Sequence, residues 1–473
     1  MSKSLRAGAA SFAALSLAAC FPAFAAPGPA APPQDQALGR EILKQLVETD
    51  TTHAHGSTGA AQEIAQRFLD AGFAREDVQV VIPPEHPTKG SVVVRLRGTG
   101  KARPILWLCH LDVVEARRED WSYDPFKLTE ADGWLYGRGT IDMKGEDAAV
   151  IDSLLRLKKE GWKGEHDIIA AFTADEEAGG LDSGIEYLLQ HDRPLIDAAY
   201  VVNPDAGGGE LKDGRRIGLG IQTSEKVFLT FELEARDKGG HSSLPTPANP
   251  IYRMSRALAR LADFRFPVHR TATTKAYFLA RSHQESGQLA EDLREAATAP
   301  GISPASLDRL AQRADINAQL HTTCTATTID GGHGESALPE RVKVLVQCRV
   351  IPGEAAADVE RMLSDVLADP SISIRVFTAA KPSPESPLTP QIVEPVREVA
   401  QGMWPGVPIV PNMSAGASDS EYTRGAGIPS YGVDGVFDEV GDSRAHGRDE
   451  RINIVAFGEE LEFTYRLMKR LAG

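Results

Sequence analysis

Cysteine is scarce in this chain: four occur in 473 residues. Cys20 lies in an N-terminal segment that we expect to be removed, which leaves Cys109, Cys324 and Cys348. Such an odd count excludes a small scaffold held together by disulfides. Cys109 ends an apolar run, so we expect a buried thiol there. Cys324 and Cys348 lie in two strand-like segments and could pair if those strands are neighbours, but free thiols are our expectation.

Basic runs and internal repeats are also lacking. The chain has 51 Lys and Arg against 66 Asp and Glu, a formal net charge of −15. An acidic chain without basic clusters argues against nucleic acid and anionic membrane surfaces as partners, and the charge mainly favours solubility. The hydrophobic content of 42% and the length indicate a globular protein of two or three domains.

No apolar run is long enough to predict a membrane span, and the run near the N-terminus reads as an export signal. Lys3 and Arg6 precede an Ala-rich apolar stretch, and Ala23-Phe24-Ala25 has the A-x-A pattern of a cleavage site. We therefore predict a signal peptide over residues 1–25 and a Pro-rich linker over residues 26–33. The mature protein would be exported, to a periplasm or outside the cell.

A lipoprotein is the alternative at this end of the chain. Leu17-Ala18-Ala19-Cys20 is similar to a bacterial lipobox, in which Cys20 would carry the lipid. Cleavage near Ala25 is the preferred interpretation.

Residues 34–219 alternate between runs of strand length and segments of helical spacing. This alternation indicates an α/β sheet with helices on both faces. The expected helices cover 36–49, 59–71, 145–160 and 181–190, and the expected strands cover 91–96, 104–109, 166–173 and 198–202.

The pattern changes near residue 220. Val227, Leu229 and Phe231 alternate with other residues, as in a half-buried antiparallel strand. Residues 220–378 therefore indicate a smaller inserted α+β domain, with strands over 226–235, 342–350 and 372–377 and helices over 249–261 and 303–314. Residues 379–473 return to the first pattern, with helices over 389–401 and 454–471 and strands over 408–411 and 428–431.

Polar residues recur where the predicted strands and turns end. His110 and Asp112 follow a strand and point the same way, so Asp112 can orient His110 or a neighbouring ligand. Asp142 follows a glycine-rich turn just before a helix, where a carboxylate can bridge two cations. Further candidates follow in the order Glu176-Glu177, Asp205 and His446.

Together these residues supply what a hydrolytic two-metal site needs: nitrogen and oxygen ligands, a bridging carboxylate and a spare glutamate for a proton. Singly, each has an ordinary explanation, such as a solvated Glu pair or an Asp N-cap. The ordered set favours the metal site, because open α/β sheets carry their active sites at the carboxyl ends of strands.

Five motifs carry a resemblance to a known family: Cys109-His110-Leu111-Asp112-Val113-Val114, Gly137-Arg138-Gly139-Thr140-Ile141-Asp142-Met143-Lys144-Gly145, Thr173-Ala174-Asp175-Glu176-Glu177, Gly239-Gly240-His241-Ser242-Ser243 and Arg444-Ala445-His446-Gly447. Across essentially all of its mature length the chain resembles the zinc metallopeptidase and deacylase family of glutamate carboxypeptidase, succinyl-diaminopimelate desuccinylase, acetylornithine deacetylase and aminoacylase. Its middle block is most similar to the branch of carboxypeptidase S and secreted N-acyl amino acid hydrolases.

The resemblance implies a zinc-peptidase-like catalytic domain, with a mixed sheet flanked by helices, and a smaller α+β domain through which the protein forms a homodimer. It also implies two zinc ions, for which cobalt could substitute. Asp142 would bridge the ions. His110 and Asp205 would complete the protein ligands of one ion, and Glu177 and His446 those of the other.

Catalytic and substrate-binding roles follow from the same resemblance. Glu176 would be the general base and acid, with Asp112 behind His110. His241 would reach the partner subunit's active site and stabilise the oxyanion.

On the substrate side, Arg349 would hold the free carboxylate, and the turn at Gly416 would line the same pocket. Ser336 stands where the family often has a substrate-gripping Asn, so contacts at that position differ.

The sequence therefore predicts an exported enzyme that cleaves the amide bond of small peptides or N-acyl amino acids with a free carboxylate, in the manner of a carboxypeptidase. An N-acyl amino acid deacylase is the nearest alternative. A non-enzymatic metal-binding protein is disfavoured by the spare carboxylate of Glu176, and a biosynthetic role is disfavoured by export.

Overall fold

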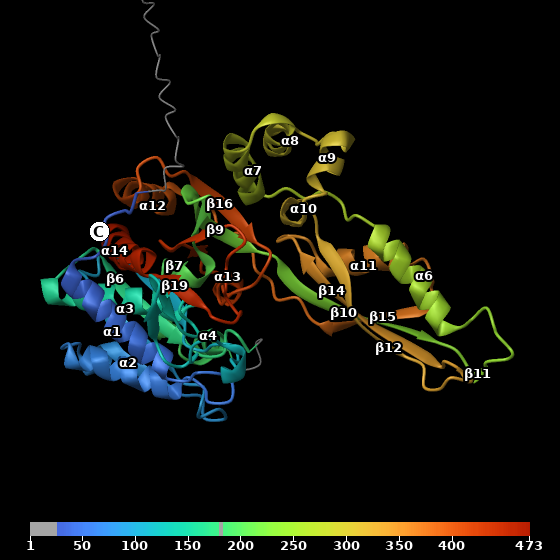
Figure 1. Cartoon of the computed structure of the whole chain (residues 1–473), viewed down its shortest axis with the longest axis horizontal. Helices are drawn as coiled ribbons and strands as arrows, with labels where there is room; N and C mark the ends of the chain where they lie inside the picture. The colour runs from blue at the N-terminus through green and yellow to red at the C-terminus, as the bar shows by residue number, and fades with distance from the viewer. Residues whose placement is uncertain (1–25, 179–182) are drawn as a thin grey trace, which may run out of the picture.

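The computed structural model describes residues 26–178 and 183–473. The expected signal peptide, with Cys20, lies outside the described residues, as do residues 181–182 of an expected helix. Two bodies are visible in Figure 1: a broad one that holds the C-terminus, and an elongated one that extends away from it. The first described residues bind to the broad body, where the amide of Gly28 donates to Glu459 and that of Ala31 to Gly458 O.

A ten-stranded mixed sheet forms the centre of the broad body. Its main path runs β1 (Val78–Val81), β2 (Ser91–Leu96), β6 (His166–Thr173), β3 (Ala102–His110), β7 (Tyr200–Asn203), β17 (Ser430–Gly432), β9 (Arg215–Glu225), β8 (Gly209–Lys212) and β18 (Phe437–Glu439), with β16 (Ile409–Ser414) beside β9. The central strands β6, β3, β7 and β17 are parallel to one another. Their carboxyl ends therefore meet at one edge of the sheet.

Helices cover both faces of this sheet, as predicted. Along β3, Ile105 and Trp107 pack on one side, whereas Leu106 and Leu108 pack on the other. The first side carries α1 (Pro33–Glu48), α2 (Thr58–Asp70), α3 (Lys144–Glu160), α12 (Pro390–Met403) and α14 (Ile454–Leu471); the second carries α4 (Gly184–His191), α5 (Arg193–Ile196) and α13 (Ser420–Gly425).

Small elements complete the broad body. A three-stranded sheet has the order β19 (Arg451–Asn453), β5 (Trp134–Tyr136) and β4 (Thr129–Ala131). Three short 3-10 helices are η1 (Arg75–Asp77), η2 (Arg118–Asp120) and η3 (Pro204–Ala206). None of the described helices is both long and apolar enough to cross a membrane.

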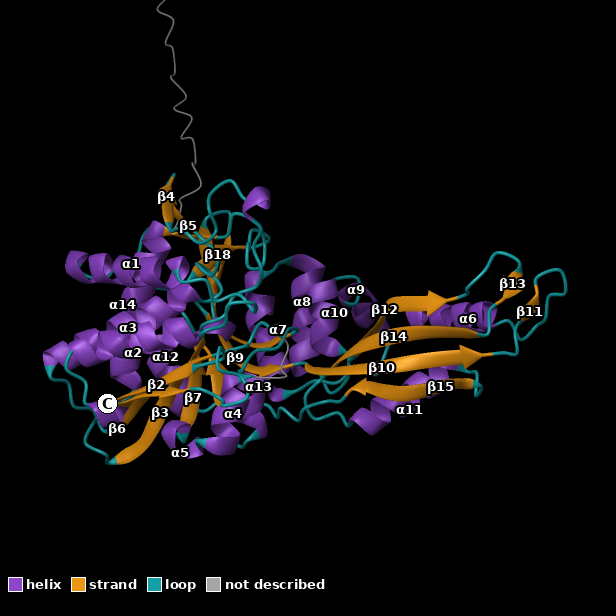
Figure 2. Cartoon of the chain, turned by 90° about the horizontal axis from the view of Figure 1, so that it is seen from below, coloured by secondary structure: helices purple, strands orange, loops and turns teal. Residues whose placement is uncertain are grey.

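The elongated body is a four-stranded antiparallel sheet with helices on one face (Figure 2). Its order is β12 (Thr323–Gly331), β14 (Arg341–Val350), β10 (Val227–Arg236) and β15 (Ile372–Thr378), and α6 (Pro250–Asp263) and α11 (Ala356–Leu367) pack on it. Burial alternates along β14, as the sequence pattern of a half-buried strand requires. At the far end β11 (Gly240–His241) pairs with β13 (Ala337–Leu338).

A helical cluster with its own core joins the elongated body to the broad one. It consists of α7 (Ala272–Gln284), α8 (Gly287–Thr298), α9 (Pro304–Leu310) and α10 (Ala314–Leu320). Gln284 on α7 donates to Ile217 O on β9, at 2.7 Å. Ser303 caps α9 and Pro304 begins it, as expected, but the helix ends at Leu310 rather than near residue 314.

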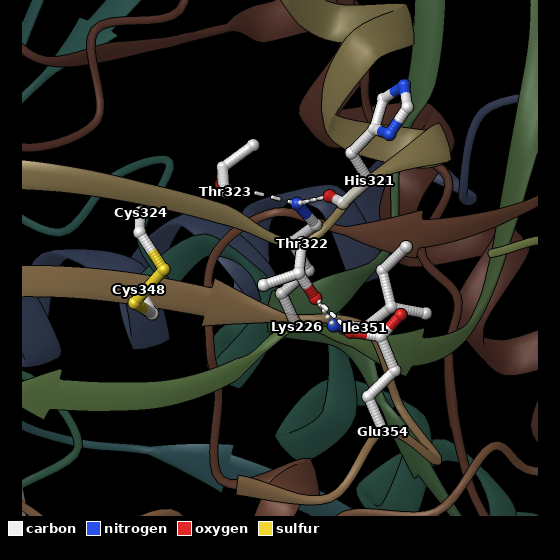
Figure 3. Close-up of a disulfide and its surroundings, with 8 residues drawn as sticks. All are labelled: Lys226, His321, Thr322, Thr323, Cys324, Cys348, Ile351 and Glu354. Atoms are coloured by element: carbon white, nitrogen blue, oxygen red, sulfur yellow. Dashed lines mark hydrogen bonds between the residues drawn. A yellow bond between two sulfur atoms is a disulfide. The ribbon is translucent and has the colours of Figure 1, made fainter. Parts of the chain in front are cut away.

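The first passage of the chain from the broad body to the elongated body takes a single residue, Lys226. β9 ends at Glu225 and β10 begins at Val227, so the boundary expected at residue 220 falls inside β9. The buried Lys226 lies between the strands, and its Nζ donates to His321 O at 2.6 Å (Figure 3).

Cys324 and Cys348 form a disulfide, so the expectation of free thiols was wrong. They face each other across β12 and β14 with a Cα–Cα distance of 4.0 Å (Figure 3). Composition alone could not show that the two strands are neighbours in this register. Cys109 is free and buried, as predicted.

Candidate metal centre

Three neighbouring parallel strands deliver the predicted ligands to one edge of the large sheet. His110 is the last residue of β3, Glu176 and Glu177 form the turn after β6, and Asp205 lies in η3, which follows β7. Because β6, β3 and β7 are adjacent, these side chains converge.

Asp142 lies between two histidines. His110 Nε2 is 3.3 Å from Asp142 Oδ1 and 3.7 Å from Asp205 Oδ1. His446 Nε2 is 3.1 Å from Asp142 Oδ2 and 2.9 Å from Glu177 Oε1. His110 and His446 therefore face different oxygens of the Asp142 carboxylate. Each also has a second carboxylate beside it, that of Asp205 for His110 and that of Glu177 for His446.

The donor set fits zinc. His110 Nδ1 lies 3.1 Å from Asp112 O, and a carbonyl can only accept, so in the neutral ring Nδ1 carries the proton and Nε2 the lone pair. That Nε2 is buried and has no hydrogen-bond partner. Ligand atoms of His110, Asp142 and Glu177 all lie within 4.8 Å of one another. Imidazole nitrogen and carboxylate oxygen are ordinary zinc ligands, and the bonded second nitrogen is typical of such histidines.

Asp112 links the two loops that carry these groups. Its carboxylate accepts hydrogen bonds from the amides of Glu176, at 3.1 Å, and Glu177, at 2.9 Å. The His110 ring is bonded to the carbonyl of Asp112 rather than to its carboxylate, which is 3.7 Å away. Asp112 thus orients the predicted ligand Glu177 with its side chain and His110 with its backbone.

Sequence reasoning missed Glu450, which holds the Asp142 loop. Its Oε1 accepts from the amides of Ile141 and Asp142, at 3.0 and 3.2 Å, and its Oε2 pairs with Arg138 at 2.5 Å. The carboxylate is fully buried. Its position four residues after His446 was the available signal, since ligand loops are often held by nearby acids.

Burial sets the charges of the site. It raises the pKa of Glu176 well above the ordinary value, with the nearby Asp205 as a further cause. Burial and Asp142 together raise the pKa of Glu177 to about 7. Hydrogen bonding to Asp142 raises the pKa of His446 to about 9. Bound cations would compensate this concentration of negative charge.

The metal centre opens into a cavity between the two bodies. The cavity has a volume of about 280 Å³, and its lining is Asp142, Glu176, Glu177, Asp205, Phe228, Arg349, Ala417 and His446. A larger hollow of about 660 Å³ shares Glu176, Phe228 and Ala417 with it. Gly416 is exposed next to Ala417, and its amide donates to Ser414 Oγ at 2.9 Å.

Arg349 enters this cavity from the elongated body. It faces Phe228 across β14 and β10, and its guanidinium lies 4.8 Å from the centre of that ring. Its Nη1 is buried without a hydrogen-bond partner. A cation with a free donor in the cavity of the metal centre suits an anionic group of a substrate.

His241 and Ser336 lie far from the metal centre of their own chain. β11, which contains His241, is at the end of the elongated body in Figure 1. The His241 ring is exposed and bonded to Ser243 Oγ at 2.8 Å, and Ser336 O accepts from the amide of Ser242 at 3.0 Å. Both residues therefore lie in one loop cluster, away from the metal centre of their own chain.

Comparisons with known proteins agree with this geometry. Residues 106–471 match the family model described as peptidase family M20/M25/M40. Human N-fatty-acyl-amino acid synthase/hydrolase PM20D1 is 27% identical over 450 residues, which cover 92% of this chain and 88% of the relative. A probable carboxypeptidase S-like 2 of Dictyostelium discoideum is 24% identical, with 90% and 84% covered. In fold, the chain matches an M20 family metallo-carboxypeptidase from Sulfolobus solfataricus, with a TM-score of 0.66, 18% identity, and 92% and 99% covered.

Proposed function

Since this chain belongs to peptidase family M20/M25/M40, we propose that it is an exported di-zinc hydrolase that cleaves the amide bond of small peptides or N-acyl amino acids with a free carboxylate. The observation that carries the proposal is the position of Asp142 between His110 and His446. His110, Asp142 and Asp205 would hold one ion, and Asp142, Glu177 and His446 the other.

When bound, the ions would lower the pKa of a water molecule and polarise the amide carbonyl. Glu176 lines the cavity without pairing to either histidine, so its carboxylate is free to accept a proton. Burial raises the pKa of Glu176, which suits a group that takes a proton from water and returns it to the leaving amine. Asp112 keeps the turn that carries Glu176 in place.

Arg349 selects the substrate by its carboxylate. Its unpartnered Nη1 and its place in the cavity opposite the metal ligands support this role. A guanidinium binds a carboxylate through two parallel hydrogen bonds, which fixes geometry as well as charge.

A homodimer through the elongated body would complete the site. The exposed His241 of one subunit would donate to the oxyanion in the other, with Ser336 and Gly416 at the edges of the substrate site. The distance of β11 from its own metal centre supports this arrangement.

The second candidate is an enzyme dedicated to N-acyl amino acids rather than to peptides, and the larger hollow favours it. Phe228, Phe377 and Tyr422 line that hollow beside Glu176, so an apolar acyl group could occupy it. A screen of dipeptides and N-acyl amino acids, with and without a chelator, distinguishes the two candidates by rate.

Metal removal and a change of Glu176 test the chemistry. Chelation should abolish hydrolysis, and zinc or cobalt should restore it. Glu176→Gln should keep the metal content and lose roughly 10²–10⁴-fold in turnover, the usual contribution of a positioned acid and base. Normal turnover of the metal-loaded variant would exclude the assignment.

Export is supported by the A-x-A pattern at Ala23-Phe24-Ala25 and by the disulfide, since disulfides persist in oxidising compartments. The mature N-terminus should be Ala26. Measurement of the intact mass tests this. A lipid found on Cys20 would instead indicate a membrane-anchored lipoprotein.

A further inference from the structure

A buried lysine lies behind the catalytic turn, which we define as Ala174, Asp175, Glu176 and Glu177. Lys89 immediately precedes Gly90 and β2, and only 6% of its surface is exposed. Its Nζ is 2.5 Å from Asp175 Oδ1, and Asp175 is itself buried. Neither residue lines the cavity of the metal centre.

The catalytic turn needs external support because of its backbone. Asp175 has a φ of 58°, a left-handed conformation that residues with a Cβ adopt at a cost. The next two amides, of Glu176 and Glu177, both donate to Asp112. Two sets of contacts therefore hold the turn: its amides bind Asp112, and the side chain of Asp175 binds Lys89.

Lys89 also contacts a second segment of the site. Its Nζ lies 3.3 Å from His53 O and 3.1 Å from His53 Nδ1. The residues before His53 pair with the segment that follows His110: Thr51 Oγ1 donates to Leu111 O at 2.7 Å, and Val113 N donates to Thr51 O at 3.3 Å. One ammonium group thus connects the catalytic turn with the segment beside Asp112.

We propose that Lys89 is a positioning residue: through Asp175 and His53 it holds the catalytic turn in the orientation that directs Glu176 and Glu177 into the metal centre. A buried ion pair contributes little net stability compared with an apolar pair of the same size. The pair is instead placed where it restrains a strained turn. The inference rests on the proposed function for the role of Glu176, but Lys89 touches neither substrate nor metal ligand.

The test compares Lys89→Met, which keeps the apolar stem, with Lys89→Arg, which keeps the cation. Lys89→Met should lower kcat by roughly 10- to 100-fold, the usual effect of losing a partner behind a ligand. KM should stay within about twofold because the cavity lining is intact. Lys89→Arg should recover most of kcat. Amide hydrogen exchange of a peptide that covers the catalytic turn should be faster in Lys89→Met, with or without metal.

Asp175→Asn is the second route to the same question, because it removes the charge that Lys89 pairs with and keeps a hydrogen-bond acceptor. If Lys89→Met fails to fold, Asp175→Asn decides by the same two measurements, kcat and exchange. If Lys89→Met and Asp175→Asn both fold, the variant that carries both changes should have a kcat no lower than that of the slower single variant. The reason is that each change removes the same interaction, the pairing of Lys89 with Asp175.

Arg156→Met is the matched control. Arg156 is a buried cation on α3 that pairs with Asp35, Asp152 and Glu462, away from the catalytic turn. It should lower Tm without changing kcat or exchange in the turn. The inference is overturned if Lys89→Met has the kcat and the amide exchange of the wild type. It is also overturned if Lys89→Met and Lys89→Arg lose kcat to the same extent. Full activity of Glu176→Gln would overturn the proposed function. If Glu176→Gln loses activity as expected and Lys89→Met keeps full activity, only the inference about Lys89 is overturned.

Discussion

Among single residues, Arg349 carries the proposed recognition of the substrate carboxylate. A substrate with a free carboxylate should be cleaved much faster than its amide, because a neutral amide cannot form the paired hydrogen bonds. Arg349→Ala should lower kcat/KM for the acid by roughly 10- to 100-fold, because a lost charged hydrogen bond costs about 1.5–3 kcal/mol. The ratio of kcat/KM for the acid to that for the amide should therefore fall. The measurement is kcat/KM for one acid and amide pair in both enzymes.

Arg375→Ala is the control for Arg349→Ala. Arg375 is an exposed arginine on β15 that pairs with Glu232, so its loss should leave the acid-to-amide ratio unchanged. Equal handling of acid and amide by the wild-type enzyme would contradict the role of Arg349. It would favour an aminopeptidase-like or simple deacylase reaction.

The residues that sequence reasoning found and missed differ in how they are placed. His110 and Asp205 follow strands directly, and Asp142 follows a glycine-rich turn, so local pattern revealed them. Lys89 and Glu450 act on segments far from their own positions. The closeness of Glu450 to His446 in the sequence marks it as an acid near the site, but which backbone amides it binds, and which carboxylate Lys89 meets, depends on the strands and loops that become neighbours.

Among the elements, α3 carries a buried carboxylate whose ionisation opposes folding. Burial raises the pKa of Asp152 to about 7, although Arg156 opposes the shift. Between pH 4 and pH 7, roughly, the folded protein keeps a proton that the unfolded chain releases, so the free energy of unfolding falls as pH rises. Asp152→Asn should remove this loss and raise stability above that of the wild type at pH 8, by at most about 4 kcal/mol.

The pH dependence distinguishes this effect from a change in packing. The stability difference between Asp152→Asn and the wild type should grow from pH 5 to pH 7 and then level off, in denaturant titrations at each pH. Asp70→Asn, at the exposed end of α2, is the control without a buried charge. A difference that stays constant across this range would contradict the assignment.

Long elements with a clear apolar pattern were predictable, and α7 was not. The buried residues of α7 are Thr273, Thr274, Phe278 and Ser282, so it lacks an apolar stripe. Phe278 joins the core of the helical cluster, and polar contacts such as that of Gln284 with β9 add to this packing. By contrast β14 alternates cleanly between buried and half-exposed residues, and its bounds agree with the prediction within one residue.

For the whole molecule, the proposed homodimer would make activity a property of the assembly, because His241 lies away from the metal centre of its own chain. His241→Ala should lower turnover by roughly 10²–10³-fold, as loss of an oxyanion donor does, without releasing metal. Mixed dimers of His241→Ala and Glu176→Gln should regain activity, because one of their two sites has both groups intact. If subunits exchange and no activity returns, His241 does not act across the interface.

Cys109 gives the molecule a built-in chemical reporter. It is the only free cysteine in the described ranges, it is 2% exposed, and burial raises its pKa well above the ordinary value. A thiol reagent can therefore modify it only when the broad body opens, so the alkylation rate measures the population or rate of opening at the strand that bears His110. Ions that bind the folded state should slow that alkylation in proportion to their affinity, which allows metal binding to be measured without any substrate.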